Sequence, residues 1–190
     1  MSDFDRLMKG VKIKKHSWDA DTVEDVTSEV VTTDNTAITL VNTGNSETFR
    51  VDHLGRKQGH YQKMNKDGTI IIKSGNYKDD LRDGVWYIYH TSKGYLTTET
   101  HFVKGVLNGR QTMYRESGQF LFDSMMKDGK HHGEFRRYNE SGYFCTRIYL
   151  NDRILPSDYI KTKFGIDVDN MTDSCKKTLK KEYDIDFIED

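Results

Sequence analysis

Gly84-Val-Trp-Tyr-Ile-Tyr89 is the clearest copy of a unit that recurs through the middle of the chain. A leading glycine returns at spacings of 25, 25 and 24 residues, at Gly59, Gly84, Gly109 and Gly133. A large residue follows two places after each glycine and another five places after it; these pairs are Tyr61 and Met64, Trp86 and Tyr89, Gln111 and Tyr114, and Phe135 and Tyr138. A period of this length, with one supersecondary element per period, is typical of a stacked array.

Each unit contains two short strands joined by a tight turn that ends in glycine, at Gly68, Gly94, Gly118 and Gly142. Glycine adopts a positive φ in such turns at no steric cost. One hairpin cannot bury its face alone, whereas stacked hairpins form a continuous sheet with a row of aromatic side chains along it. The sequence therefore predicts a mostly β fold: an extended antiparallel single-layer sheet of repeated β-hairpins, with short α-helices at the termini.

Four segments follow from these patterns. Residues 1–26 form an N-terminal segment with a short helix over 2–9 and an edge strand over 11–15. Residues 27–58 form a β-meander and a partial repeat, with strands near 30–32, 37–41 and 47–51. Residues 59–153 hold four repeats. Residues 154–190 form a helical cap, with one helix after Ser157 and a second over about 171–183.

The unit Gly-x-aromatic-x-x-Tyr, followed by x-Gly-x-Leu and by aromatic-x-x-Gly, resembles MORN-type repeats in the longer two-strand variant of bacterial and viral proteins. Residues 84–89 and 133–138 carry the resemblance best, and it covers about residues 59–152. The units depart from the pattern at Gln111, Met64, Asp80 and Asp152. The resemblance implies an extended antiparallel sheet and a binding or scaffolding role.

Composition narrows the class of protein. The net charge is -1, and no segment carries the basic excess that sequence-independent binding of nucleic acid needs. The N-terminus lacks the apolar core of a secretory signal, and no window approaches eighteen apolar residues. Cys145 and Cys175 lack metal-ligand spacing and are expected to be free thiols, with Cys145 packed in a strand. These features predict a soluble cytoplasmic protein.

Catalytic motifs are missing from the sequence. It contains no nucleophile-elbow pattern, no phosphate-binding loop and no pair of histidines at metal-ligand spacing on a predicted helix. His131 and His132 are expected in a solvated turn between two units. We therefore predict no enzymatic activity, no cofactor and no metal. An enzyme with a site between the repeats and the C-terminal helices is the alternative to this prediction.

Slots that vary between units are the best candidates for partner contacts, because aromatics at fixed slots are expected to hold the sheet together. The predicted partner-binding residues are Tyr87, Tyr95, Arg136, Arg137 and Tyr143. Tyrosine and arginine are the residues that protein interfaces favour. The leading hypothesis is a non-enzymatic protein-binding repeat module, an inhibitor or antitoxin-like protein of bacterial or phage origin.

Peripheral binding to an anionic membrane is the second hypothesis. Met171, Cys175, Leu179 and Tyr183 form one stripe of the predicted second helix, and lysines occupy its other face, at Lys176, Lys177, Lys180 and Lys181. A solvated helix face explains the same lysines. The partner's identity and the oligomeric state stay open at this stage.

Overall fold

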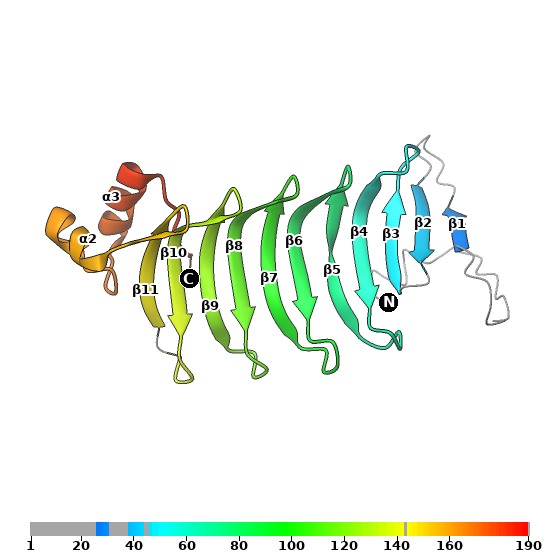
Figure 1. Ribbon diagram of the computed structural model, residues 1–190, viewed down its shortest axis with the longest axis horizontal. Helices are drawn as coiled ribbons and strands as arrows, with labels where there is room; N and C mark the ends of the chain where they lie inside the picture. The colour runs from blue at the N-terminus through cyan, green and yellow to red at the C-terminus, as the bar shows by residue number, and fades with distance from the viewer. Residues whose placement is uncertain (1–25, 31–37, 44–45, 143, 190) are drawn as a thin grey trace.

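The structure of the chain is a computed structural model that describes residues 26–30, 38–43, 46–142 and 144–189. Over these residues the strands form one antiparallel sheet in sequence order, so each strand pairs with the next along the chain (Figure 1). The strands are β1 (Val26–Val30), β2 (Ile38–Thr43), β3 (Glu47–Val51), β4 (Lys57–Met64), β5 (Ile71–Lys78), β6 (Leu81–Tyr89), β7 (Leu96–Val103), β8 (Val106–Tyr114), β9 (Phe120–Lys127), β10 (Lys130–Tyr138), β11 (Phe144–Leu150) and β12 (Arg153–Leu155).

Two helices, α2 (Ser157–Phe164) and α3 (Asp173–Tyr183), follow the sheet near the C-terminus. The predicted mostly β fold, an open antiparallel sheet of consecutive hairpins, is therefore confirmed. The helix expected over residues 2–9 and the edge strand expected over 11–15 lie outside the described residues. The β3 strand has the predicted bounds, whereas the strand expected near 30–32 begins earlier, as β1.

The hairpin turns explain the two aspartates that depart from the repeat pattern. The second central residue has a positive φ in all four turns, whether it is aspartate or glycine: 64° at Asp80, 83° at Gly105, 80° at Gly129 and 68° at Asp152. Each of their amides donates to a carbonyl of the preceding unit, at 2.7–3.1 Å. Asp80 and Asp152 add a side-chain bond, because each Oδ1 also accepts an amide of that unit, at 2.7 and 2.8 Å. Aspartate thus replaces turn glycine while tying neighbouring units together.

The sheet has two faces, named here after two adjacent residues of β6. Neighbouring residues of a strand point to opposite sides, so the Trp86 face and the Tyr87 face carry different side chains. Trp86 is 1% exposed and lies against the backbone of Gly75, where an added Cβ would stand 2.3 Å from the indole. Trp86 also contacts the rings of Tyr61 and Tyr77, with centroids 5.4 and 5.0 Å away. The fixed-slot aromatics Tyr61 and Trp86 therefore pack as predicted.

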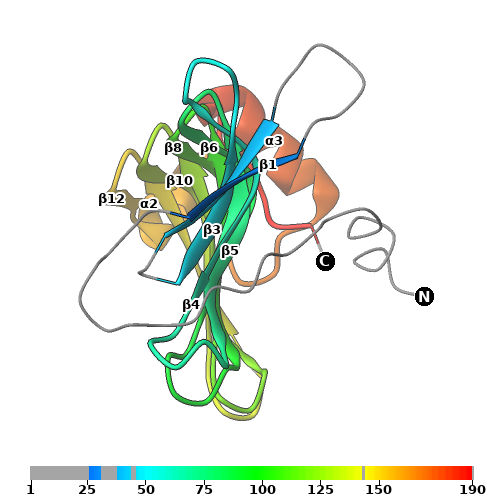
Figure 2. The same ribbon diagram turned by 90° about the vertical axis from the view of Figure 1, so that its right-hand side faces the viewer.

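The C-terminal residues close the last strands of the sheet. Ile148 of β11 is buried in a cluster with Ile160, Leu179 and Ile185 from the helical segment. The backbone amide of Thr146, also in β11, donates to Asp169 Oδ1 at 3.0 Å, so a side chain of the α2–α3 loop meets this strand where β12 does not pair. Seen from the side, α3 lies beside one face of the sheet (Figure 2).

Two predictions about single residues are wrong. His131 and His132 lie in β10 instead of a solvated turn, and His132 is 8% exposed, with Nδ1 3.0 Å from Asn151 Oδ1. The C-terminal segment covers this position, since His132 Nε2 lies 3.1 Å from the carbonyl oxygen of Asp184. Cys145 is exposed instead of packed in a core, because the sheet has a single layer and nothing described covers that position. Both cysteines are free thiols.

Candidate functional site

A group of cations lies over the aromatic rings of the Trp86 face, across β4, β5 and β6. We call Lys57, Lys63, Lys73 and Arg82 the basic patch. Lys57 Nζ lies 4.5 Å from the ring centroid of Phe49, and Lys73 Nζ lies 5.5 Å from that of Trp86. Arg82 Cζ lies 4.9 Å from the Trp86 centroid and 5.1 Å from that of Phe102. Contacts of this kind hold the cations in place over the ring faces.

Few carboxylates belong to the strands of the basic patch, although Asp80, in the turn between β5 and β6, accepts the backbone amide of Lys57 at 2.7 Å. Over β3 to β11, cross-strand pairing places Glu47 as the acidic side chain of the Trp86 face, and Lys63 Nζ already binds its Oε1 at 2.7 Å. Lys57, Lys73 and Arg82 form no salt bridge with any residue that the structure describes. Burial, and then the neighbouring charge of Arg82, lower the pKa of Lys73. The four cations of the patch thus share one carboxylate of the described strands, that of Glu47, which pairs with Lys63 and whose negative charge also acts on Lys73.

On the Tyr87 face, by contrast, two arginines each pair with a carboxylate. Arg110 binds Asp123, which is fully buried and also accepts from Thr112 Oγ1 at 3.1 Å. Arg136 is 5% exposed and donates from Nε to Glu134 Oε1 at 2.8 Å. Each of these arginines thus faces a buried carboxylate, which needs a charged partner.

Residues 184–189, named here the C-terminal tail, lie on the Tyr87 face over β8 to β10. The amide of Glu134 donates to the Asp186 carbonyl at 3.0 Å, and the amide of Ile188 donates to Glu134 Oε2 at 3.0 Å. Arg136 Nη2 and Arg110 Nη1 donate to the carbonyls of Ile188 and Glu189, both at 3.2 Å. One end of the Tyr87 face is therefore occupied by an extended, acidic segment of the chain itself.

The predicted partner-binding residues do not gather on one surface. Tyr87 is half-buried on the Tyr87 face, between Ser74 and Glu99 of the neighbouring strands. Arg137 is exposed on the opposite, Trp86 face, beside Phe122 and Cys145.

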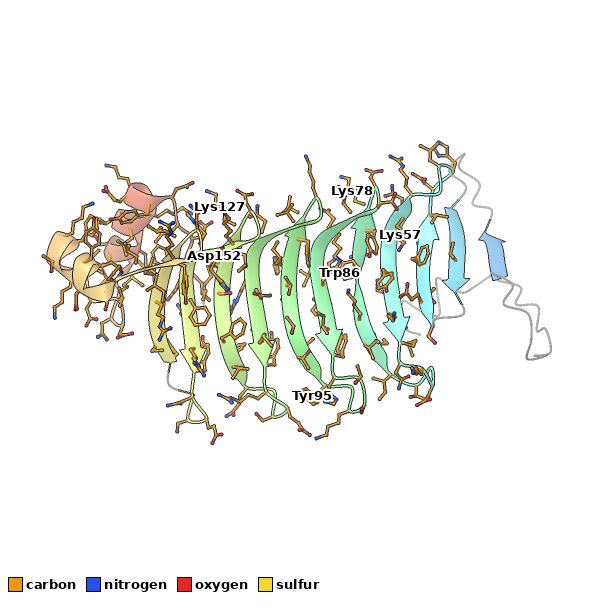
Figure 3. The ribbon with its side chains drawn as sticks, in the orientation of Figure 1. Lys57, Lys78, Trp86, Tyr95, Lys127 and Asp152 are labelled. Atoms are coloured by element: carbon orange, nitrogen blue, oxygen red, sulfur yellow. The ribbon has the colours of Figure 1, made fainter. Side chains whose placement is uncertain are left out.

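The other three candidates are less available or lie elsewhere. Arg136 is buried beneath the tail, so its prediction as a surface contact is wrong. Tyr95 lies at the end of the strands where the glycine turns connect them, away from Trp86 in the middle of the sheet (Figure 3). Its ring stacks on His90, with ring centroids 5.0 Å apart. Tyr143 lies outside the described residues.

The basic patch was not predicted from the sequence, although one repeat slot carries a signal for it. The residue two places before each leading glycine belongs to the Trp86 face, and this slot holds Lys57, Arg82, Leu107 and His131. The slot is basic in the first two units and not in the later ones. Reading this slot across the units would have located the patch.

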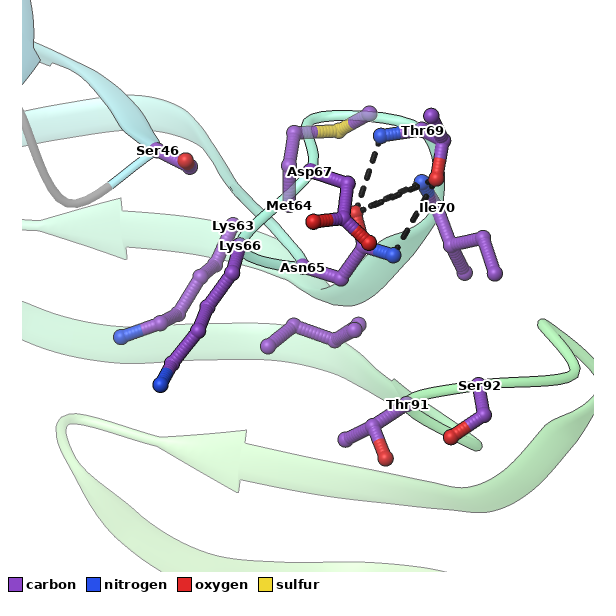
Figure 4. A pocket seen from close by; sticks show the side chains of 11 residues that line it. Ser46, Lys63, Met64, Asn65, Lys66, Asp67, Thr69, Ile70, Thr91 and Ser92 are labelled. Atoms are coloured by element: carbon purple, nitrogen blue, oxygen red, sulfur yellow. Dashed lines mark hydrogen bonds between the residues drawn. The ribbon is translucent and has the colours of Figure 1, made fainter.

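A hollow adjoins the basic patch at the turn edge of β4 and β5, with a volume of about 800 Å³ (Figure 4). Lys63 and Lys66 line it and extend in the same direction in this view. Asn65 lies in its wall, but Asn65 Oδ1 accepts the amides of Thr69 and Ile70 at 2.9 and 3.2 Å and so stabilises the turn. Asp67 also lines the hollow, so its two lysines face one carboxylate of the same turn.

The lysine face of α3 is partly compensated. Lys180 Nζ binds Asp186 Oδ1 of the tail at 2.7 Å, and Lys176 Nζ lies 6.0 Å from the Phe187 ring centroid. Lys177 and Lys181 are exposed. The four lysines that the sequence analysis considered for membrane contact are therefore not equivalent.

Three further findings concern the class of protein. Within the described ranges, neither helix is long and apolar enough to cross a bilayer. Among the same residues, no group of three or more His, Cys, Asp or Glu side chains is placed to hold a metal ion. Comparisons with protein-family models and with curated proteins found no match for this chain.

Proposed function

We propose that this chain is a non-enzymatic, protein-binding repeat module that presents one face of its sheet to a protein target. The observation that carries the proposal is the Trp86 face, where cations and aromatic rings are held in place by one another across consecutive units. Side chains ordered in this way lose little conformational entropy when a partner binds. Tyr, Trp and Arg are also the residues that carry most binding energy in protein interfaces.

The 24- and 25-residue spacing and the two-strand unit also support a relation to MORN-type repeats, and we include it in the proposal. Binding and inhibiting a target, as an inhibitor or antitoxin-like protein of bacterial or phage origin does, is the role that we assign to the module. Such a role requires a preorganised surface and no catalytic groups.

Affinity capture from a lysate of the native host, followed by mass spectrometry, tests this function. The full chain is immobilised, and free chain is added to a parallel sample as a competitor. We expect at least one protein to be retained and then lost when the competitor is present. Retention of the same proteins on beads without the chain, or the absence of any protein that the free chain displaces, would refute the proposal.

Tyr87→Ser and Arg137→Ser then show which face binds. Each change removes a side chain from one face and leaves the buried clusters intact. Capture that depends on Arg137 and not on Tyr87 is expected, because Arg137 shares the face of the basic patch. The opposite pattern would move the binding surface to the Tyr87 face while leaving the protein-binding function in place.

A further inference from the structure

We propose that the basic patch is the docking site for an acidic, extended segment of the partner protein, with aspartate or glutamate side chains placed against Lys57, Lys73 and Arg82. This inference rests on the proposed protein-binding function and names the face and the chemistry of the partner. It follows from the charges on the two faces of the sheet and from the way the tail is bound.

The two faces differ in how their cations are compensated. On the Tyr87 face, Arg110 and Arg136 each bind a carboxylate from a neighbouring strand position. On the Trp86 face, Lys57, Lys73 and Arg82 lie over aromatic rings, and Lys63 binds Glu47, the one acidic side chain that β3–β11 place on this face. Cations that outnumber the neighbouring carboxylates repel one another, as Arg82 does Lys73, and an incoming anionic side chain would relieve this repulsion. The patch therefore has the electrostatic character of half of an interface.

The tail shows that an extended segment can dock on this sheet through its backbone carbonyls. It runs over β8 to β10, where Arg110 and Arg136 donate to its backbone carbonyls at 3.2 Å. Of its acidic side chains, Asp184 pairs with Lys127 of β9, and Asp186 pairs with Lys180 of α3. The tail makes its hydrogen bonds on the Tyr87 face, so it leaves the cations of β4 to β6 on the Trp86 face untouched.

A protein segment suits this patch better than a nucleic acid does. Binding of single-stranded nucleic acid relies on exposed ring faces on which bases stack. Tyr61 and Trp86 are only 5% and 1% exposed, and the rings of Tyr77 and Trp86 meet edge to face. Carboxylates on a peptide need only the cationic groups themselves.

Fluorescence anisotropy with a labelled peptide of alternating glutamate and serine tests the inference. The control peptide carries glutamine at the glutamate positions. We compare the full chain with Lys73→Gln/Arg82→Gln and with the matched variant Lys176→Gln/Lys177→Gln, which changes the net charge equally on α3. Each ion pair at a partly exposed site contributes a few-fold to affinity. We therefore expect about tenfold weaker binding for the first variant and no change for the second.

A salt titration of the unmodified chain provides a measurement that does not depend on the variants' folding. Binding of the glutamate peptide should weaken steadily as sodium chloride is raised, because exposed ion pairs are screened. Equal binding of the glutamine peptide, equal loss in both variants, or binding that salt leaves unchanged would overturn the inference. Tighter binding of a single-stranded oligonucleotide, or of anionic vesicles, than of the glutamate peptide would overturn it too.

Failure of this inference can be told apart from failure of the proposed function. If Lys73→Gln/Arg82→Gln still captures the partner that unmodified chain captures from the lysate, the protein-binding function stands and the basic patch is not its site. If the unmodified chain captures no displaceable partner, the function itself is refuted.

Discussion

Replacing Gly133 with alanine should release the C-terminal tail. The backbone at Gly133 has a φ of 118°, and an added Cβ would stand 2.3 Å from the Asp186 carbonyl oxygen and 3.1 Å from the Asp186 nitrogen. These are backbone atoms of the tail, so no side-chain rotation can remove the clash. The tail must move away from β10, and the bonds from Glu134 and Arg136 to it are lost.

Gly109→Ala is the matched control. Gly109 occupies the same place in the preceding unit and has a φ of 106°, so the backbone strain of alanine is similar, about 1–3 kcal/mol. The nearest atoms to its added Cβ belong to the side chain of His101, the closest at 3.2 Å, which a small shift can accommodate. The difference between the two variants therefore isolates the contribution of the tail.

The size of that difference follows from what the tail buries. Ile185 and Ile188 are 0% and 1% exposed, and burial of each stabilises the fold by about 1.5–3 kcal/mol. The hydrogen bonds of Asp186 and Ile188 add about 0.5–1.5 kcal/mol each. Release of the tail returns conformational entropy of similar size. We expect Gly133→Ala to lower the free energy of unfolding by about 1–3 kcal/mol more than Gly109→Ala does.

Urea unfolding followed by tryptophan fluorescence measures this difference, and hydrogen exchange measures protection of the amides of Glu134 and Ile188. Both amides should lose protection in Gly133→Ala and keep it in Gly109→Ala. Equal stability of the two variants, with both amides still protected, would show that the tail is not held at Gly133 and would refute the reasoning.

Three further predictions concern the packing and the charges of the sheet. Gly75→Ala should lower the free energy of unfolding in urea by about 1–3 kcal/mol, because its Cβ would overlap the Trp86 indole. Adding Trp86→Leu should recover part of this loss, and strictly additive effects of the two changes would contradict the reasoning. Arg110→Met should cost about 3–5 kcal/mol because it leaves the buried Asp123 carboxylate without a cation, with the Thr112 hydroxyl as a neutral donor. Adding Asp123→Leu should restore most of the stability in the same assay, and a double variant no more stable than Arg110→Met would contradict this. The pKa of Lys73 is lowered in the folded chain from its ordinary 10.5, so its charge destabilises the fold at neutral pH, and the stability of the unmodified chain rises as pH climbs through the folded pKa. Lys73→Met should therefore be more stable than the unmodified chain at pH 7, and this gain should shrink as pH approaches 10.5. A gain that stays constant with pH would contradict the reasoning.

The alternation of side chains along a strand would have assigned part of the site to a face of the sheet from the sequence alone. Arg136 and Arg137 are neighbours in a strand, so their side chains must point to opposite faces and cannot belong to one contact surface. The same alternation separates Tyr87 from Trp86. Applied to every repeat slot, it would have put Lys57, Lys73 and Arg82 on a common face. It would not have shown that Arg136 is buried, because the tail that covers it lies about fifty residues further along the chain.

By itself, the sequence determined the repeat, the order of the hairpins and the two C-terminal helices. These features depend on local spacing: glycines at positive-φ positions, alternating side chains within strands, and helical periodicity after Ser157. Even the aspartates that replace turn glycines keep the same backbone, since Asp80 and Asp152 take up the left-handed conformation and bond to the preceding unit.

Only the tertiary structure decided which face of the sheet the C-terminal tail occupies. The tail reaches Gly133 and Arg110 across more than fifty residues, and no local pattern encodes that contact. Its position buries Arg136 and His132. The tertiary structure also decided which cations pair with a carboxylate. Asp123 binds Arg110 across a strand pair, whereas Lys73 and Arg82 lie over the Trp86 ring and form no salt bridge with a described carboxylate. Charge balance is a property of neighbours in space, and the register of the sheet sets those neighbours.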